Sequence, residues 1–320
     1  MAEKSLKTVS ESGSSSGRGT GLVNYYWQRI RRNKLAVAGL AFIVFLVALA
    51  IIGPLFTSDP TAANFDEKDI PPIGFTYLQS AYNIQTDQIT TKEIHGTPKH
   101  ILGTDSKGTD MLAMLISGAR ISLLVGLIAT GIAIILGTII GVLSAYLGGW
   151  ADNILMRFTD IMMTFPFFLL LVLIVFVFGP SLAIIVLVIG LTGWTGTARM
   201  IRSEALSLRT REFVVASKAL GARDSRVVFR HLIPNVISLI TIMATLAIPG
   251  VILAEAGLSF IGLGDPNRAS WGIILQSGWR TMRTLWWVAV EPGIMLFLTV
   301  LAFNFLGDGL RDAFDPKSNV

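Results

Sequence analysis

Two glutamates lie within the apolar segments of the second half of this chain, Glu255 and Glu291. A carboxylate at the centre of a membrane-crossing helix costs about 2.5–3.5 kcal/mol on insertion scales, so such a side chain has to be paired or to face water. Glu255 is well inside its segment, and two interpretations stand side by side: it lines a pathway or gate, or it is hydrated close to the membrane surface. Glu291 is near the end of its segment, where hydration is the favoured interpretation.

The motifs that carry enzymatic chemistry are absent from the sequence. There is no GxxxxGKS/T phosphate-binding loop, no HExxH and no GxSxG, which excludes the nucleotide hydrolysis and peptidase chemistry that these motifs perform. The chain has no cysteine, and its three histidines lack the spacing of metal ligands; His95 and His100 are predicted on the surface of an external loop. We therefore predict a non-catalytic chain without a cofactor or a metal site. The scarcity of acids in the apolar segments also disfavours a proton-driven carrier.

The composition is that of a polytopic membrane protein. Of the 320 residues 52% are hydrophobic and only 15% are charged, which is far from the mixture of soluble globular domains. The net charge of +5 arises from basic residues gathered in the N-terminal segment and in one late loop, without the interleaved aromatic residues of a nucleic-acid-binding surface. We predict the lipid bilayer as the surroundings of this chain and no nucleic acid as a partner.

Six apolar segments are long enough to cross a bilayer as helices, so the predicted fold is all-α with six transmembrane helices. These segments are residues 35–56, 121–147, 159–178, 181–198, 236–261 and 286–306. Seven basic residues precede the first segment and eight lie in the loop at 199–235. Because basic residues gather in cytoplasmic loops, this distribution predicts that this loop and both ends of the chain are cytoplasmic.

These segments divide the chain into five parts. They are a cytoplasmic N-terminal tail at 1–34, a first transmembrane helix at 35–56, an external loop at 57–118, a membrane domain of five helices at 119–308 and a cytoplasmic tail at 309–320. The serine- and glycine-rich run at 11–21 predicts disorder, the external loop is assigned no fold, and residues 148–157 are predicted as a short turn. Gly137 and Gly141 predict close approach of another helix, and packing inside the chain is preferred over contact with a second subunit.

The loop at 199–235 is too regular for a plain linker. Phe213, Ala216 and Leu220 recur at helical spacing, which predicts a short helix with an apolar stripe. Gly221 follows where the end of a helix favours a residue that is free to take a positive φ. The pattern therefore predicts a helix that ends at a glycine.

A second short helix is predicted after this glycine. Asp224 is expected to cap its start, the helix to occupy 225–233, and Pro234 to break it before the next membrane segment. A helix–glycine–helix elbow at a membrane surface is typical of a segment that another protein binds.

Residues 213–221, FVVASKALG, followed by FRHLIPN at 229–235, resemble the EAA loop of binding-protein-dependent ABC importer permeases. That loop has the sequence E-A-A, three residues, glycine, and nine further residues before I-x-L-P. Gly221 and Pro234 match this spacing, whereas Val215 stands where glutamate is usual. The departures concern side chains of the motif and leave its helix–glycine–helix shape intact.

Two further stretches narrow the resemblance. The sequence GTD at 103–105 through GARIS at 118–122, and LAEAGLSFIGLG at 253–264 with SWG at 270–272, look like the C-type permease of dipeptide, oligopeptide and nickel importers. The resemblance covers about residues 25–316, which is nearly the whole chain.

The resemblance implies the fold, the partners and the mechanism. Residues 119–308 look like an ABC importer type I transmembrane domain, which forms the translocation path together with a second, B-type permease. Two cytosolic ATP-binding subunits hydrolyse ATP, and an extracytoplasmic solute-binding protein delivers dipeptides or short oligopeptides to a multi-pass permease in the bacterial cytoplasmic membrane. The residues implied in ATPase coupling are Arg211, Glu212, Phe213, Val214, Val215, Ala216, Ser217, Lys218, Ala219, Leu220, Gly221 and Pro234.

Three other functions compete with peptide import. A nickel importer keeps the fold and changes the cargo; the absence of a His, Cys and Met cluster in the apolar segments disfavours it, although the paired methionines at 162–163 leave it open. A secondary transporter or channel that works alone requires ion-site acids that these segments lack. A membrane scaffold without transport activity leaves the glycine-rich segments and Glu255 without a role.

Overall fold

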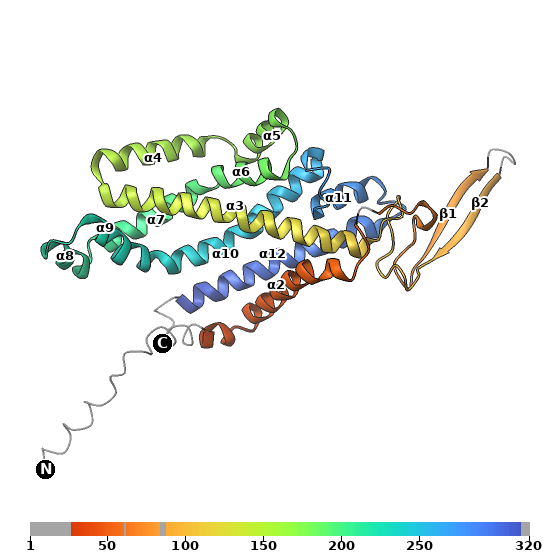
Figure 1. Ribbon diagram of the computed structural model, residues 1–320, viewed down its shortest axis with the longest axis horizontal. Helices are drawn as coiled ribbons and strands as arrows, with labels where there is room; N and C mark the ends of the chain where they lie inside the picture. The colour runs from red at the N-terminus through yellow and green to blue at the C-terminus, as the bar shows by residue number, and fades with distance from the viewer. Residues whose placement is uncertain (1–26, 61, 84–87, 315–320) are drawn as a thin grey trace, which may run out of the picture.

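Long helices make up most of the protein and lie side by side in one bundle (Figure 1). The computed structural model describes residues 27–60, 62–83 and 88–314. Its helices are α2 (Lys34–Ile52), α3 (Met111–Leu147), α4 (Gly149–Thr164), α5 (Phe167–Phe178), α6 (Leu182–Thr192), α7 (Trp194–Arg209), α8 (Glu212–Ala219), α9 (Asp224–Val227), α10 (Ile233–Leu258), α11 (Trp271–Arg280) and α12 (Trp286–Phe314). Short 3-10 turns lie at Gly53–Leu55 and Phe65–Glu67, and π-helical turns at Val228–Leu232 and Ser259–Leu263.

Within the described residues, five helical segments are long and apolar enough to cross a membrane, and one bent pair raises the number to six. The five are Lys34–Leu55, Met111–Leu147, Leu182–Arg209, Asp224–Leu263 and Trp286–Phe314. The bent pair consists of α4 and α5, which meet at an angle of 78°. The architecture is therefore that of the predicted polytopic helical membrane protein, with the third segment broken.

The break between α4 and α5 lies at Pro166, inside the segment that was predicted as one span, 159–178. Proline has no N–H to donate and disfavours helical backbone in the residue before it. That preceding residue accordingly takes an extended conformation, with φ −80° and ψ 129°. The predicted turn at 148–157 is also wrong: Gly148 and Gly149, both with positive φ, make the turn, and α4 starts at once.

Helix α3 is the central element of the bundle, since it contacts α2, α4, α6, α7, α10 and α11. Its 37 residues make a rod of about 55 Å. Gly137 and Gly141 face α7: a Cβ at Gly137 would lie 2.6 Å from the Cβ of Thr197, and one at Gly141 would lie 2.6 Å from the carbonyl oxygen of Ala198. The close approach is internal to the chain, as predicted.

A two-stranded antiparallel hairpin projects from one end of the bundle, which we call the hairpin end (Figure 1). It consists of β1 (Thr76–Asn83) and β2 (Gln88–His95), in the loop to which the sequence assigned no fold. Tyr77 packs edge-on against Trp287 with a ring distance of 6.0 Å, which attaches the hairpin to the start of α12. The hairpin adds a small β-element to an otherwise all-α chain.

Two buried tryptophans close the core at the hairpin end. The Nε1–H of Trp271, at the start of α11, donates to the carbonyl oxygen of Leu115 at 3.0 Å, and that of Trp287 donates to the carbonyl oxygen of Thr104 at 3.0 Å. Apolar side chains from α2, α3, α10, α11 and α12 surround them. Because a buried N–H is costly to leave unpaired, these bonds fix α11 and α12 to the segment around the start of α3.

Helix α12 continues to Phe314, past residue 306 where the predicted span ended. Gly307 and Gly309 allow this last part of the helix to pack closely on Leu246 and Ala36. The predicted tail at 309–320 therefore begins inside a helix. The run at 11–21 that was predicted to be disordered lies outside the described residues.

Candidate functional site

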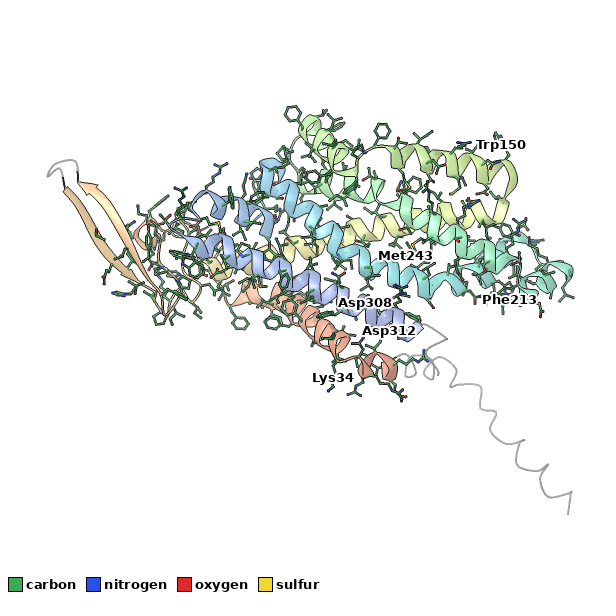
Figure 2. The ribbon with its side chains drawn as sticks, turned by 180° about the vertical axis from the view of Figure 1, so that it is seen from behind. Lys34, Trp150, Phe213, Met243, Asp308 and Asp312 are labelled. Atoms are coloured by element: carbon green, nitrogen blue, oxygen red, sulfur yellow. The ribbon has the colours of Figure 1, made fainter. Side chains whose placement is uncertain are left out.

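A short helical elbow lies at the end of the bundle opposite the hairpin, which we call the elbow end (Figure 1). The elbow comprises residues 211–227, namely α8, a turn at Gly221, and α9. Phe213, on α8, lies close to the tip of this end (Figure 2). The chain thus has a helix–glycine–helix arrangement within the predicted loop.

Helix α8 combines one buried anchor with a broad exposed surface. Val214 is fully buried and packs in an apolar cluster with residues of α3, α7, α9 and α10. Phe213 is 41% exposed and Leu220 is 89% exposed. The exposed candidate residues are Arg211, Glu212, Phe213, Val215, Ala216, Lys218, Ala219, Leu220 and Gly221, and Ser217 is half-buried. Phe213 and Leu220 are seven residues apart and so lie on one side of the helix, and exposed apolar side chains that share one side are typical of an interaction site.

Gly221 ends α8 with a φ of +81°, in the left-handed region that favours glycine. Its N–H donates to the carbonyl oxygen of Lys218 at 2.9 Å, and the N–H of Ala222 donates to that of Ser217 at 3.1 Å. These two bonds form a Schellman motif, which pairs carbonyl groups that the end of a helix otherwise leaves free. The turn between α8 and α9 is therefore defined by hydrogen bonds.

Asp224 is the first residue of α9, and the predicted cap is wrong, because Arg223 occupies the capping position without a side-chain bond. The carboxylate of Asp224 instead accepts a hydrogen bond from the hydroxyl of Tyr146, at the end of α3. The ammonium group of Lys218 lies 4.6 Å from the centre of the same Tyr146 ring. Tyr146 was not predicted, and a tyrosine at the end of an apolar segment is the only local signal for it.

Pro234 was predicted to break the helix, and this prediction is wrong, since one helical segment runs from Asp224 to Leu263. The π-helical turn Val228–Leu232 precedes the proline and changes the hydrogen-bond pattern there. Pro234 lies at the start of α10, where a missing N–H is tolerated. The side-chain amide of Asn235 donates to the carbonyl oxygen of His231 at 2.6 Å. The wider turn and this side chain accommodate the proline.

The chain matches a known family over more than half of its length. The model described as the binding-protein-dependent transport system inner membrane component matches residues 133–320, which contain the whole elbow. The chain belongs to this family. A second model, described as the N-terminal TM domain of oligopeptide transport permease C, matches residues 22–72, which include α2.

Relatives of this inner membrane component include peptide permeases. The oligopeptide transport system permease protein OppC of Haemophilus influenzae is 38% identical over 91% of this chain and 88% of that protein. The dipeptide transport system permease protein DppC of Bacillus subtilis is 36% identical over 91% of this chain and 84% of that protein. A solved structure of the MetNI methionine ABC transporter aligns with a TM-score of 0.54 and 20% identity over 64% of this chain and 98% of that chain, which shows the shared fold.

Glu255 of this inner membrane component lies buried on α10, with 1% of its surface exposed. The hydroxyl of Ser259 donates to Oε1 at 2.7 Å, and that of Ser122, on α3, donates to Oε2 at 3.5 Å. The carboxylate is thus held by hydroxyl groups of its own chain, and a pathway or gate role remains a prediction. Glu291 is half-buried on α12, and its Oε2 has no hydrogen-bond partner within the described part of the chain.

Salt bridges between α4 and α7 neutralise part of the basic loop. Arg202 donates twice to Asp152, from Nε to Oδ1 at 2.6 Å and from Nη2 to Oδ2 at 2.5 Å, and the hydroxyl of Ser144 donates to the same carboxylate. Arg199 of α7 also pairs with Asp160, further along α4. These pairs were not predicted, because residues 148–157, which include Asp152, were expected to form a short turn and not a helix beside α7.

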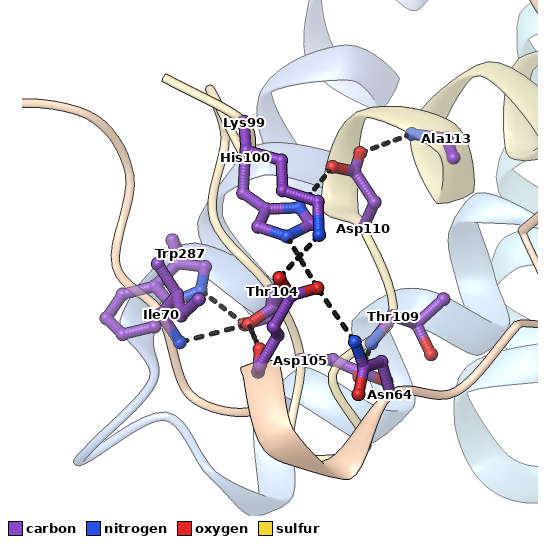
Figure 3. A network of polar contacts seen from close by, with 11 residues as sticks. Asn64, Ile70, Lys99, His100, Thr104, Asp105, Thr109, Asp110, Ala113 and Trp287 are labelled. Atoms are coloured by element: carbon purple, nitrogen blue, oxygen red, sulfur yellow. Dashed lines mark hydrogen bonds and ion pairs between the residues drawn. The ribbon is translucent and has the colours of Figure 1, made fainter. Parts of the chain in front are cut away.

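At the hairpin end, His100 bridges two carboxylates (Figure 3). Its Nδ1 lies 2.7 Å from Oδ2 of Asp110 and its Nε2 lies 3.3 Å from Oε2 of Glu67. Asp110 also caps α3 by accepting from the N–H of Ala113 at 3.0 Å. The hydrogen bond from Lys99 holds the pKa of the Glu67 carboxyl below its usual range. The prediction of a surface histidine is wrong for His100, which is buried.

A pocket of about 350 Å³ lies beside the middle of α3, between residues of α3, α5, α6, α7 and α10. Its walls are mostly apolar, and the hydroxyl-bearing Thr130 and Thr197 contribute to the lining. The hydroxyl of Thr130 is buried and has no hydrogen-bond partner within the described residues. The pocket therefore combines mostly apolar walls with two hydroxyl-bearing residues.

Proposed function

We propose that this chain is the permease subunit of an ATP-driven, binding-protein-dependent importer, and that it forms half of the path for dipeptides or short oligopeptides. The observation that carries the proposal is the exposed apolar face of α8, in a chain that belongs to the binding-protein-dependent family. The relatives named as oligopeptide and dipeptide permeases support this cargo.

In this proposal the elbow end faces the cytoplasm and the hairpin end faces the outside of the bacterial cytoplasmic membrane. Eight basic residues at 199–235 support this orientation, because basic residues gather on the cytoplasmic side. Helix α2 begins and α12 ends toward the elbow end (Figure 1), which supports cytoplasmic termini.

Helix α8 is proposed to seat in a cleft of a cytosolic ATP-binding subunit. Phe213 and Leu220 become buried there, while the charges of Arg211 and Glu212 stay at the rim of the contact. The burial of Val214 supports movement of α8 as a rigid body together with the bundle. Two ATP-binding subunits then drive two permeases, this chain and a second, B-type permease, and hydrolysis takes place on the ATP-binding subunits.

The peptide is proposed to arrive from an extracytoplasmic solute-binding protein at the hairpin end and to pass between the two permeases. The pocket that Thr130 and Thr197 help to line supports a path along this side of the chain, because hydroxyl-bearing side chains suit a peptide amide better than lipid. Glu255 is retained as a candidate gate residue, since an ionisable side chain inside a span is a functional candidate by default.

The proposal is tested by purifying the tagged chain from its native membrane in mild detergent and identifying the accompanying proteins by mass spectrometry. We expect a second permease and one or two ATP-binding subunits. Uptake of a labelled dipeptide into proteoliposomes, with the binding protein outside and ATP inside, should require hydrolysable ATP; a non-hydrolysable analogue is the control. Recovery of the chain alone, with uptake that persists without ATP, would support a secondary transporter.

The same proteoliposomes show whether the cargo of the transporter is peptide or nickel. We expect unlabelled peptide to compete with the labelled dipeptide and nickel ions to leave its uptake unchanged. Within the described residues, no group of three or more His, Cys, Asp or Glu side chains is arranged to hold a metal ion. ATP-dependent uptake of nickel without peptide uptake would establish the nickel alternative.

A further inference from the structure

Tyr146 is the residue at which both helices of the elbow meet α3. It lies one residue before the end of α3 and is almost completely buried. Its hydroxyl donates to the carboxylate of Asp224, the first residue of α9. Its ring faces the ammonium group of Lys218, on α8, at 4.6 Å from the ring centre. The Tyr146 side chain thus contacts a charged residue of each elbow helix: its hydroxyl binds Asp224 of α9, and the face of its ring contacts Lys218 of α8.

Apolar contacts join the same three helices around this tyrosine. Val214 of α8 and Val227 of α9 are fully buried in the cluster that contains Tyr146. Helix α8 is also joined to the π-helical turn Val228–Leu232, since the hydroxyl of Ser217 lies 3.2 Å from Nε2 of His231. The elbow is therefore attached to the end of α3 by apolar burial together with two charge-dependent contacts.

Helix α3 leads from this contact to the opposite end of the protein. Its last residues touch the elbow, and its first turn is capped by Asp110, which belongs to the His100 network at the hairpin end (Figure 3). A helix contains its own hydrogen bonds, so it shifts as a unit when one end is displaced. The contact at Tyr146 is thus the point at which a displacement of the elbow enters the central helix of the bundle.

We propose that Tyr146 is a positioning residue for energy coupling, and that its contacts with Asp224 and Lys218 transmit the displacement of α8 and α9 to α3. The inference rests on the proposed function, because the elbow is displaced only when an ATP-binding subunit holds it. Asp224 has a second possible role, the stabilisation of the start of α9 by its negative charge. That role is independent of Tyr146, so the two roles predict different results.

The test compares Tyr146→Phe with the wild type in the complete reconstituted transporter. The substitution keeps the ring, the apolar cluster and the contact with Lys218, and it removes only the hydroxyl. The measurements are the amount of ATP-binding subunit that purifies with the chain, the ATP hydrolysed and the peptide imported. We expect an intact complex in which the ATP hydrolysed per peptide rises roughly tenfold, the shift produced by losing one hydrogen bond to a charged group.

Matched variants separate coupling from stability. Tyr77→Phe removes a tyrosine hydroxyl at the hairpin end, where the ring packs on Trp287, and should leave the ratio unchanged. Asp224→Asn keeps an oxygen that accepts from the Tyr146 hydroxyl and should stay near the wild-type ratio. Asp224→Ala should raise the ratio as Tyr146→Phe does, and the double variant should add nothing further, because both remove the same bond.

A Tyr146→Phe transporter with the wild-type ratio of ATP to peptide overturns the proposal, and so does a double variant whose effects add. If Tyr146→Phe fails to assemble, Asp224→Ala removes the same bond from the exposed side of the contact and decides the question. Failure of the proposed function gives a different result, since the wild-type chain would then purify without ATP-binding subunits or import peptide without ATP.

Discussion

Ser259 donates a hydrogen bond of 2.7 Å to Glu255 one helical turn earlier in α10, and Ser122 of α3 donates to the other carboxylate oxygen at 3.5 Å. A carboxylate buried in an apolar segment is thereby satisfied by hydroxyl groups of the same chain. The bond from Ser122 also joins α3 to α10, so Glu255 contributes to packing whether or not it takes part in transport.

Replacement of Glu255 is expected to separate these two contributions. Glu255→Ala leaves the hydroxyls of Ser122 and Ser259 unpaired and opens a cavity, so the free energy of unfolding should fall by about 2–4 kcal/mol. Glu255→Gln keeps one acceptor oxygen and should lower the melting temperature in detergent much less. If Glu255 also acts as a gate, the glutamine variant loses peptide uptake while it stays folded. Normal uptake in a folded glutamine variant would remove Glu255 from the gate.

The left-handed turn at Gly221 should be essential for transport. A Cβ at this position meets no atom within 4 Å, so a substitution tests backbone strain alone. A non-glycine residue in this conformation costs about 1–2 kcal/mol, and a β-branched one resists it most. Gly221→Val should reduce peptide uptake while membrane insertion stays normal. Gly221→Asn is the control, because asparagine tolerates positive φ; equal uptake by both variants would contradict the requirement.

Phe213→Ala should weaken the attachment of the ATP-binding subunit by about tenfold, the effect of removing one aromatic anchor from an interface. The amount of ATP-binding subunit that purifies with the chain measures this effect. Phe176→Ala removes an aromatic side chain of α5 that is still more exposed, at 76%, and lies outside the elbow, so it should have no effect. Normal co-purification of the Phe213 variant would remove that side chain from the contact.

The double hydrogen bond between Arg202 and Asp152 should stabilise the packing of α4 on α7. Arg202→Lys keeps the charge and loses the paired geometry, so we expect a loss of about 1 kcal/mol in thermal unfolding. Arg199→Lys is the matched control, because its pair with Asp160 is about half exposed and is worth less. Equal losses of stability in both variants would show that the paired geometry of Arg202 and Asp152 adds no stability beyond that of an ordinary ion pair.

The network around Glu67 should make the stability of the hairpin end depend on pH. The hydrogen bond from Lys99 holds the pKa of Glu67 below its usual range. A carboxylate with a lowered pKa in the folded protein stabilises it above the unfolded pKa, and this stability is lost as the pH falls through the folded pKa. Hydrogen exchange of the Ile70 amide, which donates to Thr104 at 3.0 Å, reports this region.

At neutral pH the Glu67→Gln variant should exchange faster than the wild type at Ile70. The difference should shrink as the pH is lowered and vanish below the folded pKa of Glu67, where the wild-type carboxyl is also neutral. Asp66→Asn changes an exposed neighbouring carboxylate and serves as the control. A difference in exchange that persists at acidic pH would show that it arises from the altered shape of the side chain at position 67 and not from the loss of its charge.

Much of the architecture follows from local sequence. Apolar segments of about 20 residues are sufficient to predict membrane-crossing helices, and five of them were located from their length alone. The turn at Gly221 was also predictable, because a Schellman motif joins residues only a few positions apart. The break at Pro166 could also have been predicted from local sequence, because a proline disrupts the helix around it. The segment was nevertheless predicted as one continuous span.

The membrane-spanning class, most of the helices and the glycine elbow could be predicted without a structure, since they depend on hydrophobicity and on hydrogen bonds within a few residues. The partners of Asp224 and Arg202 depend on the packing of distant helices, because Tyr146 is 78 positions from Asp224 and Asp152 is 50 positions from Arg202. These side chains meet because long helices pack beside one another, and no local pattern specifies which charges then become neighbours.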